Sequence, residues 1–274
     1  MPFTIFVRRN RCLGLLTLVL SLSLVIAVSR ASAQTFETTG LQPLPPYGVF
    51  STFSAESLKQ NRVGLGLSLG RSVEPNFYRT VLQFAYGLHD RFEVLMTLPY
   101  VWDWQGDVDG FEDVTFGIKH RILDEDKYIP AVAYLLMVAP DSGRREFSTD
   151  GMVGGGLIIS KKIGPFRGHT NLIYSKPGDS DLRSNYMLNL GAELAVTNNS
   201  SILAELVGRK DYYKNKLNLL EWRVGYRIAT TENIFTTIGA GFDFKDRTPQ
   251  YRLMLSVSII LPPEKKEIRK VYEE

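Results

Sequence analysis

The fold class of this chain is decided by the stretch Val63-Gly64-Leu65-Gly66-Leu67-Ser68-Leu69-Gly70. A large apolar residue stands at every second position, and glycine or serine stands between them. Side chains of a β-strand alternate between two faces, so this spacing places all the large residues on one side. A helix would distribute the same leucines around its whole circumference. The stretch therefore predicts a strand with one apolar face.

The same alternation recurs as far as residue 261, which predicts an all-β chain. Eleven further segments carry it: 78–86, 92–100, 114–119, 129–139, 154–160, 170–174, 186–194, 202–206, 220–228, 234–244 and 251–261. Both faces are apolar or ambiguous in 129–139 and 154–160, so their register stays open. We expect about twelve antiparallel strands, and single-chain bacterial outer-membrane barrels have an even number.

The connections between these segments support a barrel that spans a membrane. Three are short, at 88–90, 197–200 and 230–233, and four longer polar ones, at 101–110, 140–150, 175–182 and 210–216, lie between them. Such alternation is typical of periplasmic turns and extracellular loops. After Val28 no apolar stretch reaches the length of a spanning helix, and an open sheet edge cannot face lipid, so a closed barrel is the remaining membrane structure. Aromatic residues at both strand ends fit two interfacial girdles. The alternative is a soluble sandwich or lipocalin-like barrel whose apolar face is its core.

The ends of the chain predict an exported protein. Three arginines precede an apolar stretch from Leu13 to Val28, and Ala31-Ser32-Ala33 matches the small-x-small cleavage pattern. We expect residues 1–33 to be a cleaved signal peptide; an uncleaved anchor helix is the alternative. Residues 34–60 are expected to form an extended periplasmic leader, partly inside the barrel mouth. Residues 61–261 would be the barrel and 262–274 a charged periplasmic tail, with both termini periplasmic.

Composition excludes several kinds of site. The only cysteine is Cys12, so the mature chain has no disulfide and no thiolate metal site. The signal peptide removes four of 32 basic residues, which leaves 28 against 29 acidic residues and a net charge of about −1. This balance gives no support for nucleic-acid binding.

Charged residues within the strands fall mostly on the face opposite the large apolar residues. The lumen-facing candidates for selectivity are Arg79, Glu93, Asp113, Lys119, Arg121, Glu193, Glu205, Glu221, Arg223, Arg227, Asp243 and Arg252. An Arg or Lys facing lipid near the midplane costs about 2–4 kcal/mol, so any such barrel would show this segregation. Two interpretations stay open: the charges tune which solutes pass through a water-filled pathway, or they pair across a narrow lumen and hold it together.

Catalytic and metal sites are weakly supported. His169, expected to face the lumen, could meet Ser160 or Asn171 in a hydrolase, although a lumenal histidine is more often structural. The acidic residues Asp107, Asp109, Glu112 and Asp113 lie around one outer loop. They could hold a divalent cation, but a solvated acidic loop is the simpler interpretation. We predict no enzyme activity, no cofactor and no metal.

Residues 86–122 resemble a known family most clearly. The run 86–94, Tyr-Gly-Leu-His-Asp-Arg-Phe-Glu-Val, leads to Leu98-Pro99-Tyr100, and the run 110–119, Gly-Phe-Glu-Asp-Val-Thr-Phe-Gly-Ile-Lys, follows the loop. This arrangement, with the later turn Thr231-Glu232-Asn233, resembles the outer-membrane proteins of the meta-pathway of phenol degradation. The resemblance implies an outer-membrane channel that takes up hydrophobic or aromatic compounds. Outer-membrane barrels commonly end on an aromatic residue, whereas here the last strand ends at Leu261 and a charged tail follows.

The sequence thus predicts an outer-membrane channel or transporter for passive passage of small molecules. Its expected partners are outer-membrane lipid, the solute, and the barrel-assembly and periplasmic chaperone machinery. Two alternatives stay open: a membrane-embedded hydrolase using His169, and a plugged barrel with a structural or partner-binding role.

Overall fold

Twelve antiparallel strands form a closed barrel in the computed structural model, which describes residues 39–73, 76–104, 106–210, 217–244 and 250–262. The barrel strands among these residues are β3 (Val63–Val73), β4 (Asn76–His89), β5 (Phe92–Trp104), β7 (Thr115–Leu123), β8 (Ala131–Ala139), β9 (Met152–Ile163), β10 (Phe166–Pro177), β11 (Asn185–Thr197), β12 (Ser200–Lys210), β13 (Leu217–Ala229), β14 (Ile234–Asp243) and β15 (Gln250–Leu261). The predicted signal peptide, and the tail beyond Pro262, lie outside the described residues.

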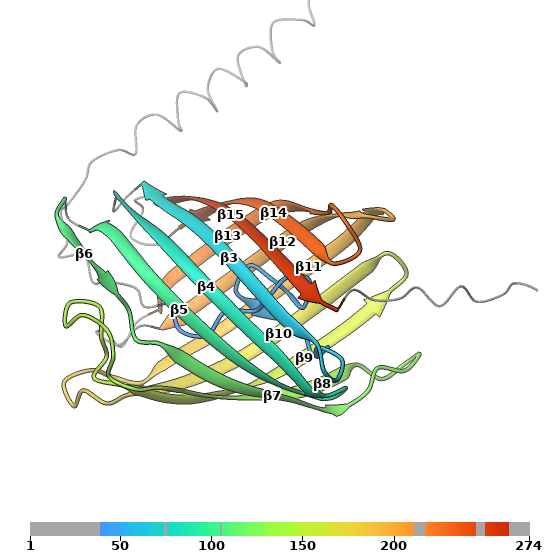
Figure 1. Cartoon of the computed structure of the whole chain (residues 1–274), viewed down its shortest axis with the longest axis horizontal. Coiled ribbons are helices and arrows are strands. Elements are labelled where there is room, and N and C mark those ends of the chain that lie inside the picture. Colours follow the sequence, from blue (N-terminus) through green and yellow to red (C-terminus); the bar gives the residue numbers. More distant parts are fainter. Residues whose placement is uncertain (1–38, 74–75, 105, 211–216, 245–249, 263–274) are drawn as a thin grey trace, which may run out of the picture.

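Every barrel strand pairs with its neighbours in the sequence, and β3 closes the ring by pairing with β15 as well as with β4. The strands are tilted around the barrel axis (Figure 1). A short extra strand, β6 (Val108–Phe111), pairs only with the end of β5. Closure leaves no barrel strand with an open edge, as a spanning sheet requires. No helix among the described residues is long and apolar enough to cross a membrane.

The period-two pattern of the sequence separates an apolar exterior from a buried interior. Leu65, Leu67 and Leu69 of β3 lie on the exposed face, and Gly64 and Gly66 are buried between them. The exterior at mid-height is mostly aliphatic. Aromatic rings contact one another near the ends of neighbouring strands, in the pairs Tyr100–Phe111, Tyr174–Tyr186 and Phe242–Tyr251. An apolar band bordered by aromatic rings is the surface that a membrane-spanning barrel presents to lipid.

The two segments of open register are resolved by burial. Ala131, Ala133 and Leu135 of β8 point inward, as do Ile158 and Ser160 of β9. Both faces of β8 are apolar because the exterior faces lipid, while the interior packs against another part of the chain.

Connections at one barrel end are mostly tight, and those at the other are mostly long. Residues 90–91, 164–165 and 198–199 join strands at the tight-turn end, whereas residues 140–151 and 178–184 join them at the long-connection end. Two connections depart from the alternation: residues 124–130 are longer than the other tight turns, and only residues 74–75 separate β3 from β4. The first barrel strand, β3, begins at the tight-turn end, and the last, β15, ends there.

Candidate functional site

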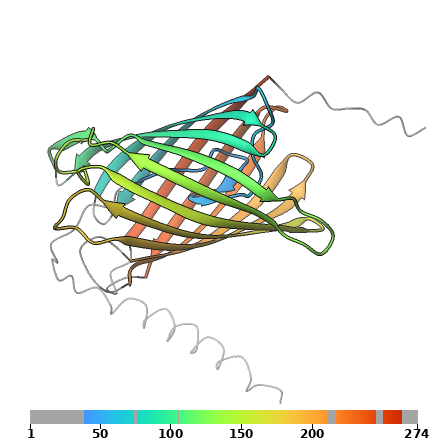
Figure 2. The same ribbon diagram turned by 90° about the horizontal axis from the view of Figure 1, so that it is seen from below.

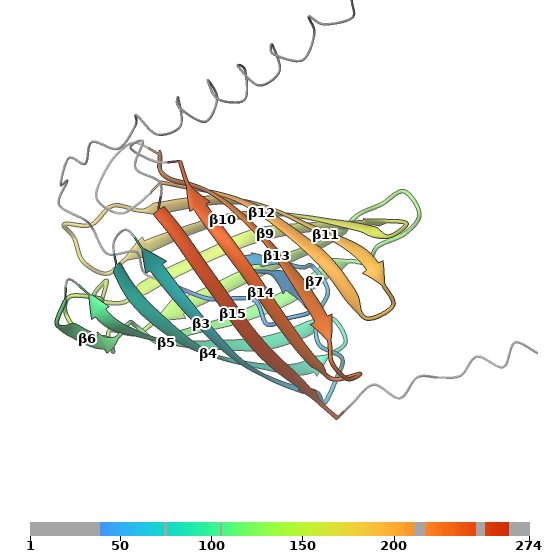
Figure 3. The same ribbon diagram turned by 90° about the horizontal axis from the view of Figure 1, so that it is seen from above.

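The segment of residues 39–60, which we call the plug, lies inside the barrel. It contains a small hairpin of β1 (Gly48–Val49) and β2 (Thr52–Phe53), which pair with each other and with no barrel strand. Figure 1 shows this hairpin in blue between the near and far walls, and Figures 2 and 3 show it inside the barrel from two further directions. Val49, Phe53 and Leu58 are fully buried. The segment that the sequence places as a leader at the mouth is therefore, from residue 39 onward, part of the lumen's filling.

The plug begins in the half of the barrel near the long connections and ends at the tight turns. Thr39 donates its backbone N–H and its hydroxyl to the carboxylate of Glu112, which follows β6. At the other end, the N–H of Asn61 donates to the carbonyl of Gly87, beside the β4–β5 turn. The chain thus runs lengthwise through the lumen before it enters the first barrel strand.

Uncharged polar side chains of the wall bind the plug's backbone. Asn171 accepts from the N–H of Phe53 at 2.6 Å and donates its own amide to the carbonyl of Phe53 at 2.9 Å. Ser160 accepts from the N–H of Ala55 at 2.8 Å. A buried backbone group needs a partner, and the plug has only two short strands of its own, so the wall supplies the missing partners.

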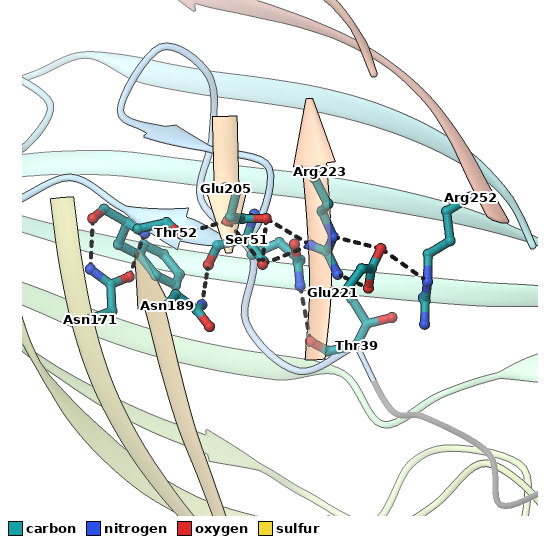
Figure 4. Close-up of polar contacts among 11 residues, drawn as sticks. Thr39, Ser51, Thr52, Asn171, Asn189, Glu205, Glu221, Arg223 and Arg252 are labelled. Carbon is teal, nitrogen blue, oxygen red and sulfur yellow. Dashed lines mark hydrogen bonds and ion pairs between the residues drawn. The ribbon is translucent and has the colours of Figure 1, made fainter. Parts of the chain in front are cut away.

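A chain of charged residues joins the plug to strands β12, β13 and β15 (Figure 4). Glu205 accepts from the N–H of Ser51 at 2.9 Å, from the hydroxyl of Thr52 at 2.5 Å and from Arg223 at 3.0 Å. Arg223 also forms an ion pair with Glu221 at 2.9 Å, and Glu221 lies 3.4 Å from Arg252. Glu205 and Glu221 are fully buried, so each carboxylate depends on these arginines for compensation.

Two further groups of charges hold the plug. Arg227 donates to the carbonyl of Gly48 at 2.5 Å and pairs with Glu193 at 3.3 Å. Across the lumen, Lys119 pairs with Glu93 at 2.8 Å and donates to the carbonyl of Ser54 at 2.9 Å and to that of Glu56. Glu93 in turn accepts from the N–H of Leu58 at 2.6 Å.

Nine of the twelve candidate selectivity residues belong to these lumenal ion pairs. They are Arg79, Glu93, Lys119, Glu193, Glu205, Glu221, Arg223, Arg227 and Arg252. Asp243 is buried at the end of β14. Arg121 pairs with Asp124 near the tight turns.

Asp113 differs from the prediction, because it precedes β7 and its carboxylate faces the loop of residues 140–150. That carboxylate accepts from the backbone N–H groups of Ser142, Gly143 and Thr149. Asp113 therefore organises an outer loop and does not line the lumen.

Glycines in the wall make room for the plug's side chains. A Cβ built on Gly66 would lie 2.7 Å from Leu44 Cδ1, and one built on Gly225 would lie 2.6 Å from Phe50 Cζ. A Cβ on Gly191 would lie 3.0 Å from the Cβ of Thr52. At these three inward positions, which the strand pattern leaves unexplained, a larger side chain would meet the plug.

One side of the lumen is apolar and packs against the plug. Leu41, Leu44, Phe53, Ala55 and Leu58 of the plug form a buried cluster with wall residues of β4, β5, β8, β9 and β15. The wall members are Ala85, Leu95, Ala131, Ala133, Leu135, Ile158 and Ile260. The plug is thus held by apolar packing as well as by charges and hydrogen bonds.

A cavity of about 180 Å³ remains in the lumen on the long-connection side of the plug. Its apolar lining includes Met137, Met152, Met187, Met254, Ile173, Val207 and Phe77. Its charged lining consists of Arg71, Arg79, Arg209, Arg223, Arg227 and Arg252, and no Asp or Glu lines it among the described residues. Arg71 belongs to the exposed face of β3, while the other five lie on the inward face of their strands.

His169 and Ser160 lie together, as the hydrolase alternative requires, with the hydroxyl oxygen 2.8 Å from Nδ1. Both are nearly inaccessible, at 4% and 3% exposure, and the same hydroxyl accepts the N–H of Ala55. The plug therefore covers the pair, and the pair helps to bind the plug.

The acidic residues of the outer loop do not gather around a common point. Glu112 pairs with Arg79 at 2.7 Å, Asp113 binds the 140–150 loop, and Asp109 accepts from the N–H of Asp103 at 2.6 Å. Within the described residues, no group of three or more His, Cys, Asp or Glu is placed to hold a metal ion.

Sequence reasoning missed the residues that bind the plug through uncharged groups. Thr97 accepts from the N–H of Gln42 at 3.1 Å, Gln83 donates to the carbonyl of Pro43 at 3.0 Å, and Ser258 donates to the carbonyl of Pro45 at 2.8 Å. Their inward position in the alternation was the available signal, but an inward polar residue is equally expected beside water.

Comparison with solved structures identifies the fold. A crystal structure of an outer membrane channel from Pseudomonas putida F1 matches with a TM-score of 0.63 and 14% identity, covering 75% of this chain and 97% of that one. This chain has the fold of an outer-membrane channel. The KdgM porin in complex with disordered oligogalacturonate matches with a TM-score of 0.56, 10% identity and coverage of 72% and 98%. The NanC porin matches with a TM-score of 0.56, 12% identity and coverage of 71% and 98%. No family model matches the sequence, and no curated protein matches it in sequence.

Proposed function

We propose that this protein is an outer-membrane channel for passive passage of small molecules. The observation that carries the proposal is a closed barrel with an apolar exterior whose buried, charged lumen contains a cavity. Passage down a gradient needs only a path of suitable width and lining, so the function requires no cofactor. Outer-membrane lipid would contact the exterior, and the assembly and chaperone machinery that serves such barrels would deliver the chain.

Passage in this proposal requires the plug to move. The plug fills the lumen between the cavity and the tight-turn end, and it is the part of the chain best suited to displacement. Its strands β1 and β2 pair only with each other, so the plug can leave its position without breaking any backbone ladder of the barrel. Elements held by side-chain contacts open at lower free energy than those held in a continuous sheet.

The lumenal charges have two functions in this proposal. In the closed state, pairs such as Lys119–Glu93 and Arg223–Glu205 hold the plug. Once the plug moves, the same side chains line the path and select solutes by charge. The two interpretations that the sequence left open thus describe two states of one lumen.

The structural neighbours and the resemblance of residues 86–122 both support a channel. The ligands of the structural neighbours belong to those proteins: one neighbour is a porin in complex with oligogalacturonate. For this chain we propose membership in, or near, the phenol meta-pathway family, with solutes that include hydrophobic or aromatic compounds. A permanently closed, partner-binding barrel is the second candidate, favoured by the number of hydrogen bonds that hold the plug.

Planar-bilayer recording tests the proposal with the refolded mature protein, residues 34–274. Discrete current steps are expected from preparations whose gel mobility shifts on heating, the mark of a folded barrel. Arg223→Gln should change the ratio of anion to cation permeability, because it removes a positive charge from the path. Folded protein that passes neither ions nor uncharged solutes into liposomes would overturn the channel and leave the closed barrel.

A further inference from the structure

The cavity on the long-connection side of the plug is lined by two chemically different kinds of side chain. Methionines from four strands, Met137, Met152, Met187 and Met254, supply flexible apolar side chains. Arginine side chains of β3, β4, β12, β13 and β15 reach the same space, and no described carboxylate lines it. A purely apolar ligand would not use the arginines, and a fully hydrated ion would not use the methionines.

We propose that this cavity is a binding site for small amphipathic carboxylates, with one anionic head and one apolar body about the size of a six-membered ring. The inference rests on the proposed channel function and names a substrate class for it. The carboxylate would face the arginines of β12, β13 and β15, and the apolar body would lie against the methionines.

The size of the ligand follows from the volume of the cavity. Its 180 Å³ is comparable to an engineered protein cavity of about 150 Å³ that binds benzene. One ring with a single carboxylate therefore fits. Methionine side chains adapt to ligands of different outline, so the site would accept a class of acids.

The sign of the ligand's charge follows from the positions of the ion pairs. Glu112, Glu205 and Glu221 lie behind the arginines, since each is bound by Arg79, Arg223 or Arg252 and none reaches the cavity surface. A ligand in the cavity is closer to the guanidinium groups than to their partners. It therefore meets a positive potential, although much of each arginine's charge is compensated. The guanidinium group also offers paired N–H donors that match a carboxylate.

Arg252 is the arginine best suited to a test. It lines the cavity and approaches Glu221 at 3.4 Å, but Glu221 keeps two hydrogen bonds of 2.9 Å from Arg223 when Arg252 is changed. Arg252→Gln thus removes a cavity-facing cation without leaving a buried carboxylate uncompensated. Met187→Gln is the corresponding change on the apolar side. Arg91→Gln is the matched control, because Arg91 is half-exposed at a tight turn and pairs with Asp124.

Binding is measured calorimetrically on the mature chain in lipid nanodiscs with four probes: benzoate, benzyl alcohol, benzylamine and acetate. Benzoate should bind at least about tenfold more tightly than the other three, which lack the charge, reverse it or lack the ring. Arg252→Gln should weaken benzoate by about tenfold and leave benzyl alcohol unchanged. Met187→Gln should weaken both, and Arg91→Gln should weaken neither.

Equal binding of benzoate and benzyl alcohol, or unchanged benzoate binding by Arg252→Gln, would overturn the inference. So would the absence of benzoate binding to folded wild-type protein. Bilayer recording on the same preparations separates this failure from that of the channel. Protein that conducts but does not bind benzoate refutes only the site, whereas protein that binds benzoate but never conducts refutes only the channel.

Discussion

Lys119 is the residue whose loss should loosen the plug most. Its ammonium group is fully buried, pairs with Glu93 at 2.8 Å, and donates to the carbonyls of Ser54 and Glu56. Lys119→Met keeps an unbranched side chain, shorter by one atom, and removes all three interactions. It also leaves the Glu93 carboxylate, which is 2% exposed, without its cation.

The expected loss is about 3–5 kcal/mol, the usual cost of removing one partner of a buried ion pair. Lys119 and Glu93 face each other on β7 and β5, whose backbone pairing the substitution leaves intact. The plug can leave more easily than the two strands can separate, so most of the loss should appear as easier release of the plug. The equilibrium for release would then shift by about two to three and a half orders of magnitude.

Hydrogen exchange measures this shift directly. The amides of Ala55 and Leu58, which donate to Ser160 and Glu93, should exchange about a hundredfold or more faster in Lys119→Met, while the β10–β11 ladder keeps its protection. The double variant Glu93→Gln with Lys119→Met is the control, because it removes the uncompensated charge and should recover part of the loss. Unchanged exchange at Ala55 and Leu58 in the single variant would refute the assignment of Lys119 as an anchor of the plug.

Three further predictions concern the barrel exterior, the wall and the histidine. Leu190 lies on the exposed face in the middle of β11 at 42% exposure, so Leu190→Arg should lower the free energy of unfolding from liposomes, measured by urea titration, by about 2–4 kcal/mol. Leu190→Phe should lower it by much less, and equal effects of the two substitutions would argue against a lipid-facing position. Gly239→Val should displace the ring of Phe50, since a Cβ at Gly239 would lie 2.6 Å from Cζ of Phe50. Limited proteolysis should then cut within residues 39–60 while the heat-dependent gel shift persists, and a plug that stays protected would show that the wall moves instead. His169→Asn should leave bilayer conductance intact and change no ester hydrolysis, whereas loss of a measurable hydrolase activity would favour the enzyme alternative.

Strand positions and faces were predictable because lipid imposes a strict requirement on one face of every strand. Outward residues near the membrane midplane must be apolar, so the alternation in β3 or β15 shows which side faces out. The inward face has no such single requirement. In β8 it is apolar because Leu135 packs against the plug, and the sequence alone could not distinguish it from the lipid face.

The plug itself could not be recognised from periodicity, because side chains of the distant wall bind it. Its residues have no repeating pattern, and partners such as Asn171 and Ser160 are more than a hundred positions away in the sequence. The inward charges were recognised, but their pairing depends on the register of adjacent strands, which places Glu205 beside Arg223 and Glu93 beside Lys119. Asp113 shows a further limit. It stands two positions before Thr115 and so fits the inward positions of β7, yet the strand begins only at Thr115.

Redox-controlled tethering of the plug tests the central claim most directly. Residues 34–274 contain no cysteine, and a Cβ at Gly191 would lie 3.0 Å from the Cβ of Thr52. Thr52→Cys with Gly191→Cys can therefore form a disulfide between plug and wall after a shift of under about 1 Å. Comparison of the oxidised and reduced forms cancels the loss of the Thr52 hydrogen bond to Glu205, which both forms share. We predict that oxidation abolishes the current steps in a planar bilayer and that a reductant restores them. Steps of the same size and frequency in both forms would contradict the account, because conduction would then not require the plug to move.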